Sequence, residues 1–219
     1  MRLVFLGPPG AGKGTQSKII SNVLNIPHLS TGEILRDMSE NNDYIGKELK
    51  NIMSKGMLVS DDMITSVVKK RILMQDCNKG FILDGFPRTL PQANSLESIM
   101  SEENLKISSV ILVDVPEDEL LKRITGRLLC NKCSKIYNKY SNPFPENGCG
   151  RKDCSKENIM VRSDDEEEAF KQVRLKKYYN ETFPLIDYYK SKNLLKKFDG
   201  SGSAEKISKK IIDFINVIY

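Results

Sequence analysis

The chain has 219 residues, of which 39% are hydrophobic and 29% charged, and its formal net charge is +5. This composition is typical of one globular domain of ordinary size and excludes a disordered or fibrous chain. No apolar run is long enough to cross a membrane, and the N-terminus lacks a signal-peptide pattern, so we expect a cytoplasmic protein. The mild, dispersed positive charge fits small anionic substrates as well as nucleic acid.

A glycine-rich loop follows the first predicted strand. Apolar residues at 3–6 predict a buried strand, the loop Gly7–Thr15 reads GPPGAGKGT, and a helical pattern covers residues 16–24. In this context the backbone N–H groups and the helix dipole bind phosphate, and Lys13 adds a mobile positive charge. The alternative is a glycine-rich turn that binds nothing. The agreement of lysine, glycine spacing and flanking elements favours a nucleotide-phosphate site.

One position in this loop departs from the common pattern. A Ser or Thr ordinarily follows the lysine, but position 14 is Gly and the hydroxyl comes only at Thr15. The usual hydroxyl ligand for Mg²⁺ is therefore missing. We expect phosphates and water to hold the ion, with an acidic residue elsewhere orienting that water.

Strands and helices alternate along most of the remaining chain. Helical patterns cover residues 32–39, 45–55, 61–76, 92–102, 118–128 and 204–218, and apolar runs predict strands at 81–83, 110–115 and, more weakly, 194–198. Asp61 is the predicted N-cap of its helix, and Pro116 lies near the start of another. Alternation of this kind predicts an α/β fold, a parallel sheet with helices on both faces, with the active site at the carboxyl ends of the strands. The segment Asp84–Arg88 follows such a strand end.

Three further features have structural interpretations. His28, the single histidine, is interpreted as a packed side chain beside a short turn, and Cys77 as a packing residue. The acidic run Asp164–Glu168 reads as the solvated start of a helix.

Four of the five cysteines lie within 25 residues of one another. Cys130 and Cys133 form one close pair, and Cys149 and Cys154 form a second, in a segment that is rich in polar residues and poor in aliphatic ones. This spacing predicts a structural Zn²⁺ site with four thiolate ligands, which would stabilise an insert that has no core of its own. Asp153 is an alternative to Cys154 as the fourth ligand, and unliganded thiols are the alternative to zinc. A closed site of this kind leaves no coordination position for catalysis.

With these motifs in place, the chain resembles adenylate kinases of the long type, which have a zinc-binding lid. The resemblance covers essentially the whole length. It rests on the loop GPPGAGKGT, on HLSTGEILR from His28, on FILDGFPRT from Phe81 followed by Pro91-Gln92-Ala93, on RITGR from Arg123, and on RSDD from Arg162. It implies a P-loop NTPase-type parallel sheet with two inserts. The core would be residues 1–29, 60–125 and 164–219, with a helical monophosphate-binding insert at 30–59 and the zinc-binding lid at 126–163.

The resemblance also implies a reaction and its site residues: Mg²⁺-dependent transfer of a phosphoryl group from ATP to AMP, giving two ADP. Asp84 would orient Mg²⁺-bound water, and Asp164 would contact lid arginines or substrate. Matching donor-side positions for ATP are Gly10, Ala11, Gly12, Lys13, Gly14, Thr15, Arg123, Arg127, Ile136, Tyr137 and Gly202. Matching acceptor-side positions for AMP are Thr31, Arg36, Met57, Leu58, Val59, Gly85, Phe86, Pro87, Arg88, Gln92, Arg162 and Arg174. The arginines at 88, 123, 127, 162 and 174 and Lys13 would stabilise the transferring phosphoryl group.

The chain departs from the family pattern at the lid exit. In the family the arginine there is followed by another one eleven residues later, whereas here that position is Val173 and the arginine is Arg174. One residue turns a helix by about 100°, so the offset changes which way the side chain points. Since the following residues again match the family, we expect the extra residue within Asp164–Glu168 and assign the role to Arg174.

Alternative functions remain open at this point. One is another nucleoside monophosphate kinase, acting on a pyrimidine monophosphate or using GTP; Gln92 and the long lid favour AMP. Another is a zinc-ribbon nucleic-acid-binding protein with an NTPase core, which the basic, tyrosine-containing insert suggests. A switch-type GTPase would need an Asn-Lys-x-Asp motif, which is missing. We expect a monomer that binds ATP, AMP and ADP and neither nucleic acid nor membrane.

Overall fold

The computed structural model describes residues 1–41, 43–55, 57–133, 135–146, 148–150 and 154–218. Its centre is a five-stranded parallel sheet in the order β2-β3-β1-β4-β8. The strands are β1 (Arg2–Leu6), β2 (His28–Ser30), β3 (Phe81–Asp84), β4 (Ser109–Asp114) and β8 (Leu195–Asp199). The predicted strands at 3–6, 81–83, 110–115 and 194–198 are therefore confirmed. The short strand β2 was not predicted, because three residues are too few to show a periodic pattern.

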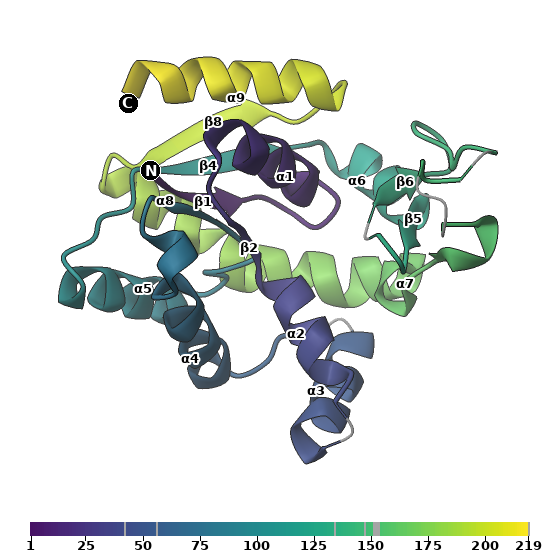
Figure 1. Ribbon diagram of the computed structural model, residues 1–219, viewed down its shortest axis with the longest axis horizontal. Coiled ribbons are helices and arrows are strands. Elements are labelled where there is room, and N and C mark those ends of the chain that lie inside the picture. The colour runs from purple at the N-terminus through teal and green to yellow at the C-terminus, as the bar shows by residue number, and fades with distance from the viewer. Residues whose placement is uncertain (42, 56, 134, 147, 151–153, 219) are drawn as a thin grey trace.

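Helices cover both faces of this sheet (Figure 1). They are α1 (Lys13–Leu24), α4 (Asp61–Ile72), α5 (Leu90–Glu102), α6 (Glu117–Thr125), α8 (Pro184–Ser191) and α9 (Ala204–Ile218). Alternate residues of β1 point to opposite faces: Val4 and Leu6 pack into a cluster with α4, α5 and α8, while Leu3 and Phe5 pack into a cluster with α1, α6 and α9. All four side chains are almost completely buried, so both faces of the central strand are core.

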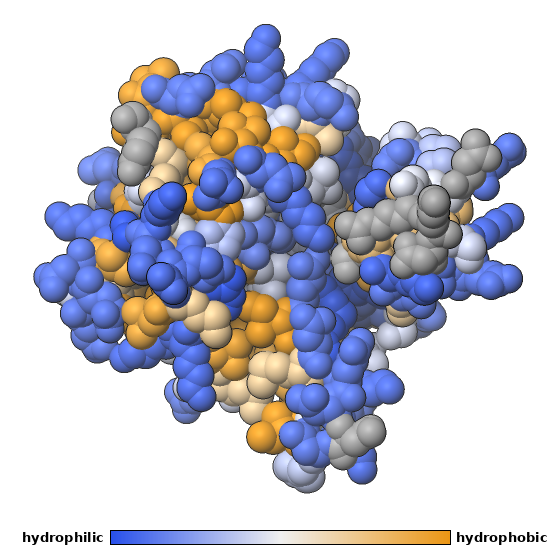
Figure 2. Space-filling view, viewed as in Figure 1, coloured by the Kyte–Doolittle hydropathy of each residue, from blue (hydrophilic) through white to orange (hydrophobic). Residues whose placement is uncertain are grey.

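Two smaller units extend from the sheet edge at which the strands end (Figure 1). One consists of the helices α2 (Thr31–Ser39) and α3 (Tyr44–Ser54), which follow β2. The other contains a three-stranded antiparallel sheet of β5 (Arg127–Cys130), β6 (Ile136–Asn138) and β7 (Ile159–Met160), in the order β6-β5-β7. Figure 2 shows that polar side chains cover most of this face of the molecule, while apolar side chains gather beside α1 and α9 and between α2 and α4.

Three predicted helix boundaries change for local reasons. The helix predicted at 61–76 ends at Ile72, and a 3₁₀ turn follows at Gln75–Cys77. The helix predicted at 118–128 ends at Thr125, because the chain continues as β5 from Arg127. The N-cap of α4 is Ser60, whose side chain accepts a hydrogen bond from the Met63 N–H, so the prediction of Asp61 is wrong by one residue.

The segment after the lid differs most from its prediction. Residues Ser163–Asp165 form a 3₁₀ turn in which Asp164 and Asp165 are buried, so these two are not part of a solvated helix start. After the short α7 (Glu167–Ala169), the helix is π-helical over Phe170–Leu175 and again over Tyr178–Thr182. A π turn contains one residue more than an α turn. The π turn at Phe170–Leu175 can therefore accommodate a residue added before Arg174, whereas the position of the extra residue within Asp164–Glu168 stays a prediction.

Candidate active site

The glycine loop has the backbone geometry of a phosphate site. Gly7, Gly10 and Gly12 have φ of 143°, 88° and 91°, and α1 begins at Lys13 directly after them. A Cβ at Gly7 would lie 2.3 Å from the Val113 carbonyl oxygen, so close packing on β4 also requires glycine there. The loop therefore presents a helix N-terminus whose first N–H groups are free to bind an anion.

Lys13 lies folded back over this loop. Its Nζ donates hydrogen bonds to the Gly7 carbonyl at 2.7 Å and the Pro8 carbonyl at 2.9 Å. Burial, helped by the positive charges of Arg88, Arg174 and Arg127 and opposed by Asp84, lowers the pKa of Lys13 to about 8. The ammonium is held where an incoming phosphate gives it a stronger partner than two neutral carbonyls.

Gly14 has a specific neighbour, the carboxylate of Asp84. A Cβ built on Gly14 would lie 3.3 Å from Asp84 Oδ2. The carboxylate at the end of β3 thus occupies the space beside the loop into which a serine or threonine at position 14 would project. A serine or threonine at position 14 would therefore be crowded by Asp84, and an acidic side chain lies beside the loop, as the sequence predicts.

His28 contacts the same carboxylate. Its Nε2 lies 3.2 Å from Asp84 Oδ2, and only 8% of its side chain is exposed. Burial would raise the pKa of Asp84, but the hydrogen bond from His28 and the charges of Lys13 and Arg88 hold it below its ordinary value. The sequence interpretation found the packing of His28 and missed this contact, because β2 was not predicted and only its pairing with β3 brings the two residues together.

Arg88 lies in the loop between β3 and α5, where hydrogen bonds to neighbouring residues fix its backbone and its side chain. Arg88 Nε donates to the Gly85 carbonyl at 2.8 Å, and its backbone N–H donates to Gln92 Oε1 at 2.7 Å. Gly85 has a φ of 84°, and a Cβ there would lie 2.8 Å from Thr31 Oγ1, which donates to the Asp84 carbonyl. The turn therefore needs glycine and places Thr31, Gly85 and Arg88 together.

Two acceptor-side predictions are modified by burial. Gln92 lines the first cavity, but its amide is already paired at both ends, since its Nε2 donates to Asp61 Oδ1 at 2.6 Å. Phe86 is fully buried in the core, so its side chain supports the loop and does not face the cavity. The predicted Met57, Leu58, Val59 and Pro87 do line the cavity described next.

Two adjoining cavities meet at a group of basic side chains. The first is lined from α2, the segment 57–59 and the β3–α5 loop, and the second by Gly10–Thr15, the lid and Gly202. Both cavities are lined by Lys13, Arg36, Arg88, Arg162 and Arg174. Burial lowers the pKa of Arg36 and of Arg174 to about 10, so both remain charged at neutral pH. This arrangement suits an anion that passes between two neighbouring sites.

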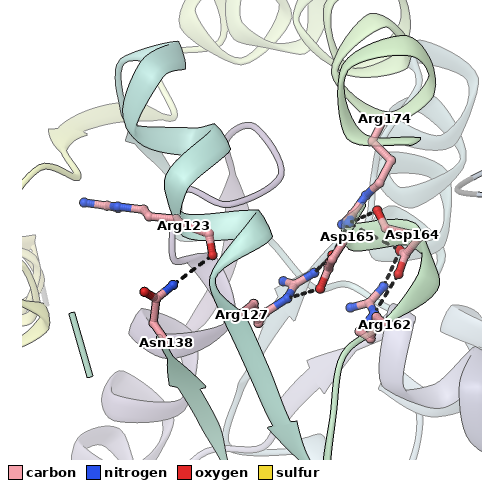
Figure 3. A network of polar contacts seen from close by, with 7 residues as sticks. All are labelled: Arg123, Arg127, Asn138, Arg162, Asp164, Asp165 and Arg174. Carbon is pink, nitrogen blue, oxygen red and sulfur yellow. Dashed lines mark hydrogen bonds and ion pairs between the residues drawn. The ribbon is translucent and has the colours of Figure 1, made fainter. Parts of the chain in front are cut away.

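Three arginines converge on two buried aspartates at the lid exit (Figure 3). Asp165 accepts hydrogen bonds from Arg127 Nε and Arg174 Nη1, each at 2.6 Å, and a second one from Arg127. Asp164 accepts from Arg162 Nε at 2.9 Å and lies 3.3 Å from Arg174 Nη1. Burial would raise the pKa of Asp164, but Arg174 and Arg162 hold it below its ordinary value. Asp165 was not predicted as a site residue; its place beside Asp164 in an acidic run before a helix gave no sign that it is buried.

Arg123 does not join this group. Its guanidinium points away from the aspartates in Figure 3, and its Nη2 donates to the Gly200 carbonyl at 2.9 Å and to Glu119 Oε2 at 3.1 Å. Arg123 therefore lies apart from the Arg127, Arg162 and Arg174 cluster, and its contact with phosphate stays a prediction. Arg123 lies instead on the side of the second cavity formed by Gly202, Ser203 and Ala204.

The lid residues Ile136 and Tyr137 have different surroundings. They are adjacent on β6, so their side chains point to opposite faces. Ile136 is 38% exposed and lines the second cavity, whereas Tyr137 is 7% exposed and packs edge-on against Phe144 beside the cysteines. Tyr137 nevertheless also lines the second cavity, so its contact with a nucleotide base stays a prediction, although most of its ring packs in the lid core.

The four predicted cysteines come together. Cys130, Cys133, Cys149 and Cys154 place their sulfur atoms within 4.8 Å of one another. Four thiolates at about 2.3 Å from one Zn²⁺ would be separated by distances of this order, so the cluster fits one metal ion. Cys154 is a member of the cluster, whereas the alternative ligand Asp153 lies outside the described residues. Four close cysteines that could hold a metal are thus present.

Comparisons with known proteins agree with this site. The adenylate kinase family model matches residues 5–194. The chain is 46% identical to an adenylate kinase of Thermotoga neapolitana, with 97% of this chain and 96% of that protein covered. It is 46% identical to one of Archaeoglobus fulgidus, covering 96% of each, and 41% identical to one of Ruminiclostridium cellulolyticum, covering 99% and 100%. No described helix is long and apolar enough to span a membrane. Together with the parallel sheet, the phosphate loop and the converging arginines, these matches show that the chain belongs to the adenylate kinase family.

Proposed function

We propose that the two adjoining cavities bind AMP and ATP, and that the chain transfers the terminal phosphoryl group of ATP to AMP where they meet. The observation that carries this assignment is the shared lining by Lys13, Arg36, Arg88, Arg162 and Arg174. Phosphoryl transfer requires positioning and charge stabilisation rather than acid–base chemistry, and planar guanidiniums pair well with phosphate oxygens.

The donor phosphates would lie on the Gly10–Thr15 loop, where Lys13 exchanges its carbonyl partners for phosphate oxygens. Mg²⁺, when bound with the nucleotide, neutralises charge on the phosphates. Asp84, beside Gly14, is placed to hold the water of such an ion, and the contact with His28 keeps its carboxylate oriented. Gly202 and Arg123 would lie beside the base, with Ile136 and Tyr137 covering it from the lid.

The acceptor would lie against Thr31, Arg36, Arg88 and the segment 57–59, with the apolar side chains of the first cavity around its base. Arg127, Arg162 and Arg174 would leave Asp164 and Asp165 in part and turn to the phosphates when the site closes. Closure has a chemical purpose, since water in an open site would compete with AMP as acceptor. We infer that residues 30–59 and 126–163 are the inserts that move.

We also propose that the cysteine cluster binds Zn²⁺ and that its role is structural. Four thiolates would fill the tetrahedral coordination of one Zn²⁺, which leaves no open position for a reacting ligand. We further infer a monomer in the reducing cytoplasm, where thiolate ligands persist, acting on ATP, AMP and ADP with neither nucleic acid nor membrane as partner.

The test is a phosphoryl-transfer assay in which ATP or GTP is combined with AMP, CMP, UMP or GMP. We expect ATP with AMP to give the highest kcat/KM by at least about tenfold, a difference of about 1.4 kcal/mol. The relatives named above are adenylate kinases, so the pyrimidine-kinase alternative is not favoured. A preference for CMP or UMP over AMP would contradict the acceptor assignment.

A further inference from the structure

Lys177 is a cation of the first cavity that no motif accounts for. It lies three residues after Arg174 and one before Tyr178, between the two π-helical turns. Residues at positions i, i+3 and i+4 share one helix face. All three of these side chains line the first cavity, together with Met57, Val59 and Arg88.

The lining separates Lys177 from the other basic groups. Five basic residues line both cavities: Lys13, Arg36, Arg88, Arg162 and Arg174. Among the described residues that line the cavities, Lys177 is a basic residue found in the first cavity and not in the second. A group that acts in this cavity alone is placed to act on one substrate and not on the other.

Lys177 forms a weak ion pair with Glu181, a residue close to Arg88. Lys177 Nζ is 3.1 Å from Glu181 Oε1, and the two side chains are 31% and 34% exposed. Such i,i+4 pairs are worth only a few tenths of a kcal/mol, so exchanging the partner costs little. The residue after Glu181, Thr182, donates a hydrogen bond from its Oγ1 to the Arg88 carbonyl at 2.8 Å. Burial lowers the pKa of Arg88, and the negative charges of Asp84, Asp164 and Glu181 oppose this shift, so Glu181 lies near the Arg88 guanidinium.

We propose that Lys177 exchanges Glu181 for the phosphate group of the bound nucleoside monophosphate and so contributes to AMP affinity alone. This inference rests on the proposed assignment of the first cavity to AMP. The Lys177 ammonium is suited to this role, because it acts as a point charge on a flexible side chain and needs no fixed orientation toward the phosphate. The guanidiniums that line the first cavity bind phosphate oxygens in a fixed plane and therefore orient the group.

Calorimetric binding of AMP and of ATP, each alone at 0.15 M salt, tests the proposal on the intact chain. Lys177→Met is expected to raise the Kd for AMP about five- to tenfold, the effect of one charge-assisted contact, and to leave the Kd for ATP within about twofold. Lys177→Arg keeps the charge and should retain most of the affinity. Lys176→Met is the matched control, since Lys176 is the exposed neighbour that pairs with Gln172; both affinities should stay unchanged.

An unchanged AMP affinity in Lys177→Met, an equal loss for ATP, or the same loss in Lys176→Met would overturn the proposal. Arg88→Ala, measured in parallel, separates the two levels of the argument. If Arg88→Ala weakens AMP binding and Lys177→Met does not, the inference about Lys177 fails by itself. If neither variant weakens it, the assignment of the cavity to AMP fails. If Lys177→Met has a lower melting temperature than the parent chain, the AMP and ATP affinities are measured instead for Lys177→Gln, at a temperature where this variant and the parent are both folded.

Discussion

At the scale of single residues, the site depends on charged groups held close to one another before any substrate arrives. Asp165 is completely buried and accepts hydrogen bonds from Arg127 and Arg174, two of the side chains proposed to contact phosphate. Removing one member of such a buried set leaves the others unpaired, which is costly. The aspartates therefore keep the arginines charged and oriented in a free site.

Arg174 should be essential for turnover despite its shifted position in the sequence. We expect Arg174→Ala to lower kcat about a hundredfold or more, the usual effect of removing a preorganised charge that stabilises the transferring group. Arg174→Lys should also lose much of the activity, because an ammonium cannot bind two oxygens in a fixed plane. Lys171→Ala is the control, since Lys171 is exposed and pairs with Glu167. Steady-state kinetics showing normal kcat in Arg174→Ala would contradict this role.

Lys13 should cost the free protein stability while serving catalysis. Its pKa falls from the ordinary 10.5 to about 8 through burial, so below pH 8 the folded chain carries a charge that it disfavours. Between pH 8 and 10.5 the unfolded chain binds a proton that the folded chain does not, and stability therefore rises with pH in this window. Lys13→Met should raise the free energy of unfolding at pH 7 by about 1–3 kcal/mol, at about 1.4 kcal/mol per pKa unit, and should abolish activity.

Chemical denaturation of the parent chain and Lys13→Met across pH 6 to 10 measures this difference. The advantage of the variant should shrink as the pH rises above 8. A variant that is less stable than the parent at pH 7 would show that the hydrogen bonds from Lys13 to Gly7 and Pro8 outweigh the burial of the charge.

At the scale of elements, the helix that follows the lid shows how the fold absorbs an added residue. The π turn at Phe170–Leu175 lets Arg174 face Asp164 and Asp165 while Phe170 stays buried. Single π turns inside helices are frequent at functional sites, where they change the direction of side chains. The direction of the Arg174 side chain thus depends on the number of residues in this helical turn, and the sequence separation between Arg162 and Arg174 does not predict it.

Deleting Lys171 should convert this π turn into an α turn and leave Arg174 in register with the helix that follows. We expect the variant to keep kcat within about tenfold of the parent, because the Lys171 side chain is exposed and pairs with Glu167, which is also exposed. Deleting Lys176 is the comparison. It lies after Arg174 and should rotate that side chain by about 100° relative to Tyr178, with loss of most activity. Equal activity of the two deletions would show that the π turn does not set the direction of Arg174.

At the scale of the whole molecule, the lid is stabilised by different means from the core. Its three short strands bury one small cluster around the cysteines, with Tyr137 and Phe144, while the main sheet buries large apolar clusters on both faces. A unit this small needs a metal or a disulfide to stay folded. We therefore expect a metal bound by the four cysteines to matter for the stability of the lid more than for the chemistry.

Purified protein should contain about one zinc per chain. Stripping the metal with a chelator should lower the melting temperature, and it should lower kcat, measured at a temperature where the protein is still folded, much less. Cys154→Ser should bind the metal less tightly, because it removes one of the four thiolate ligands of the cluster. Metal analysis of protein prepared without chelators, together with calorimetry, provides both measurements. A chain free of zinc with an unchanged melting temperature would contradict the metal proposal.

The sequence by itself determined the features that depend on local pattern. The glycine loop between strand and helix, the amphipathic helix at 204–218 and the paired cysteines could all be predicted, because each needs particular residue types at fixed spacing. The α/β sheet followed from the alternation of apolar runs with helical patterns. Each of these features shows in the type and spacing of residues along the chain, even where the residues that finally meet lie far apart in sequence.

Only the tertiary structure decided which side chains meet. The contact of His28 with Asp84 spans 56 residues and requires strand β2 to pair with β3. The burial of Asp165 between Arg127 and Arg174, the turn of the Tyr137 ring into the lid core and the π turn before Arg174 likewise depend on packing against distant elements. The physical reason is the same in each case. A buried charged or aromatic side chain is oriented by the groups that pair or pack with it, and those groups come from segments that are distant in the sequence.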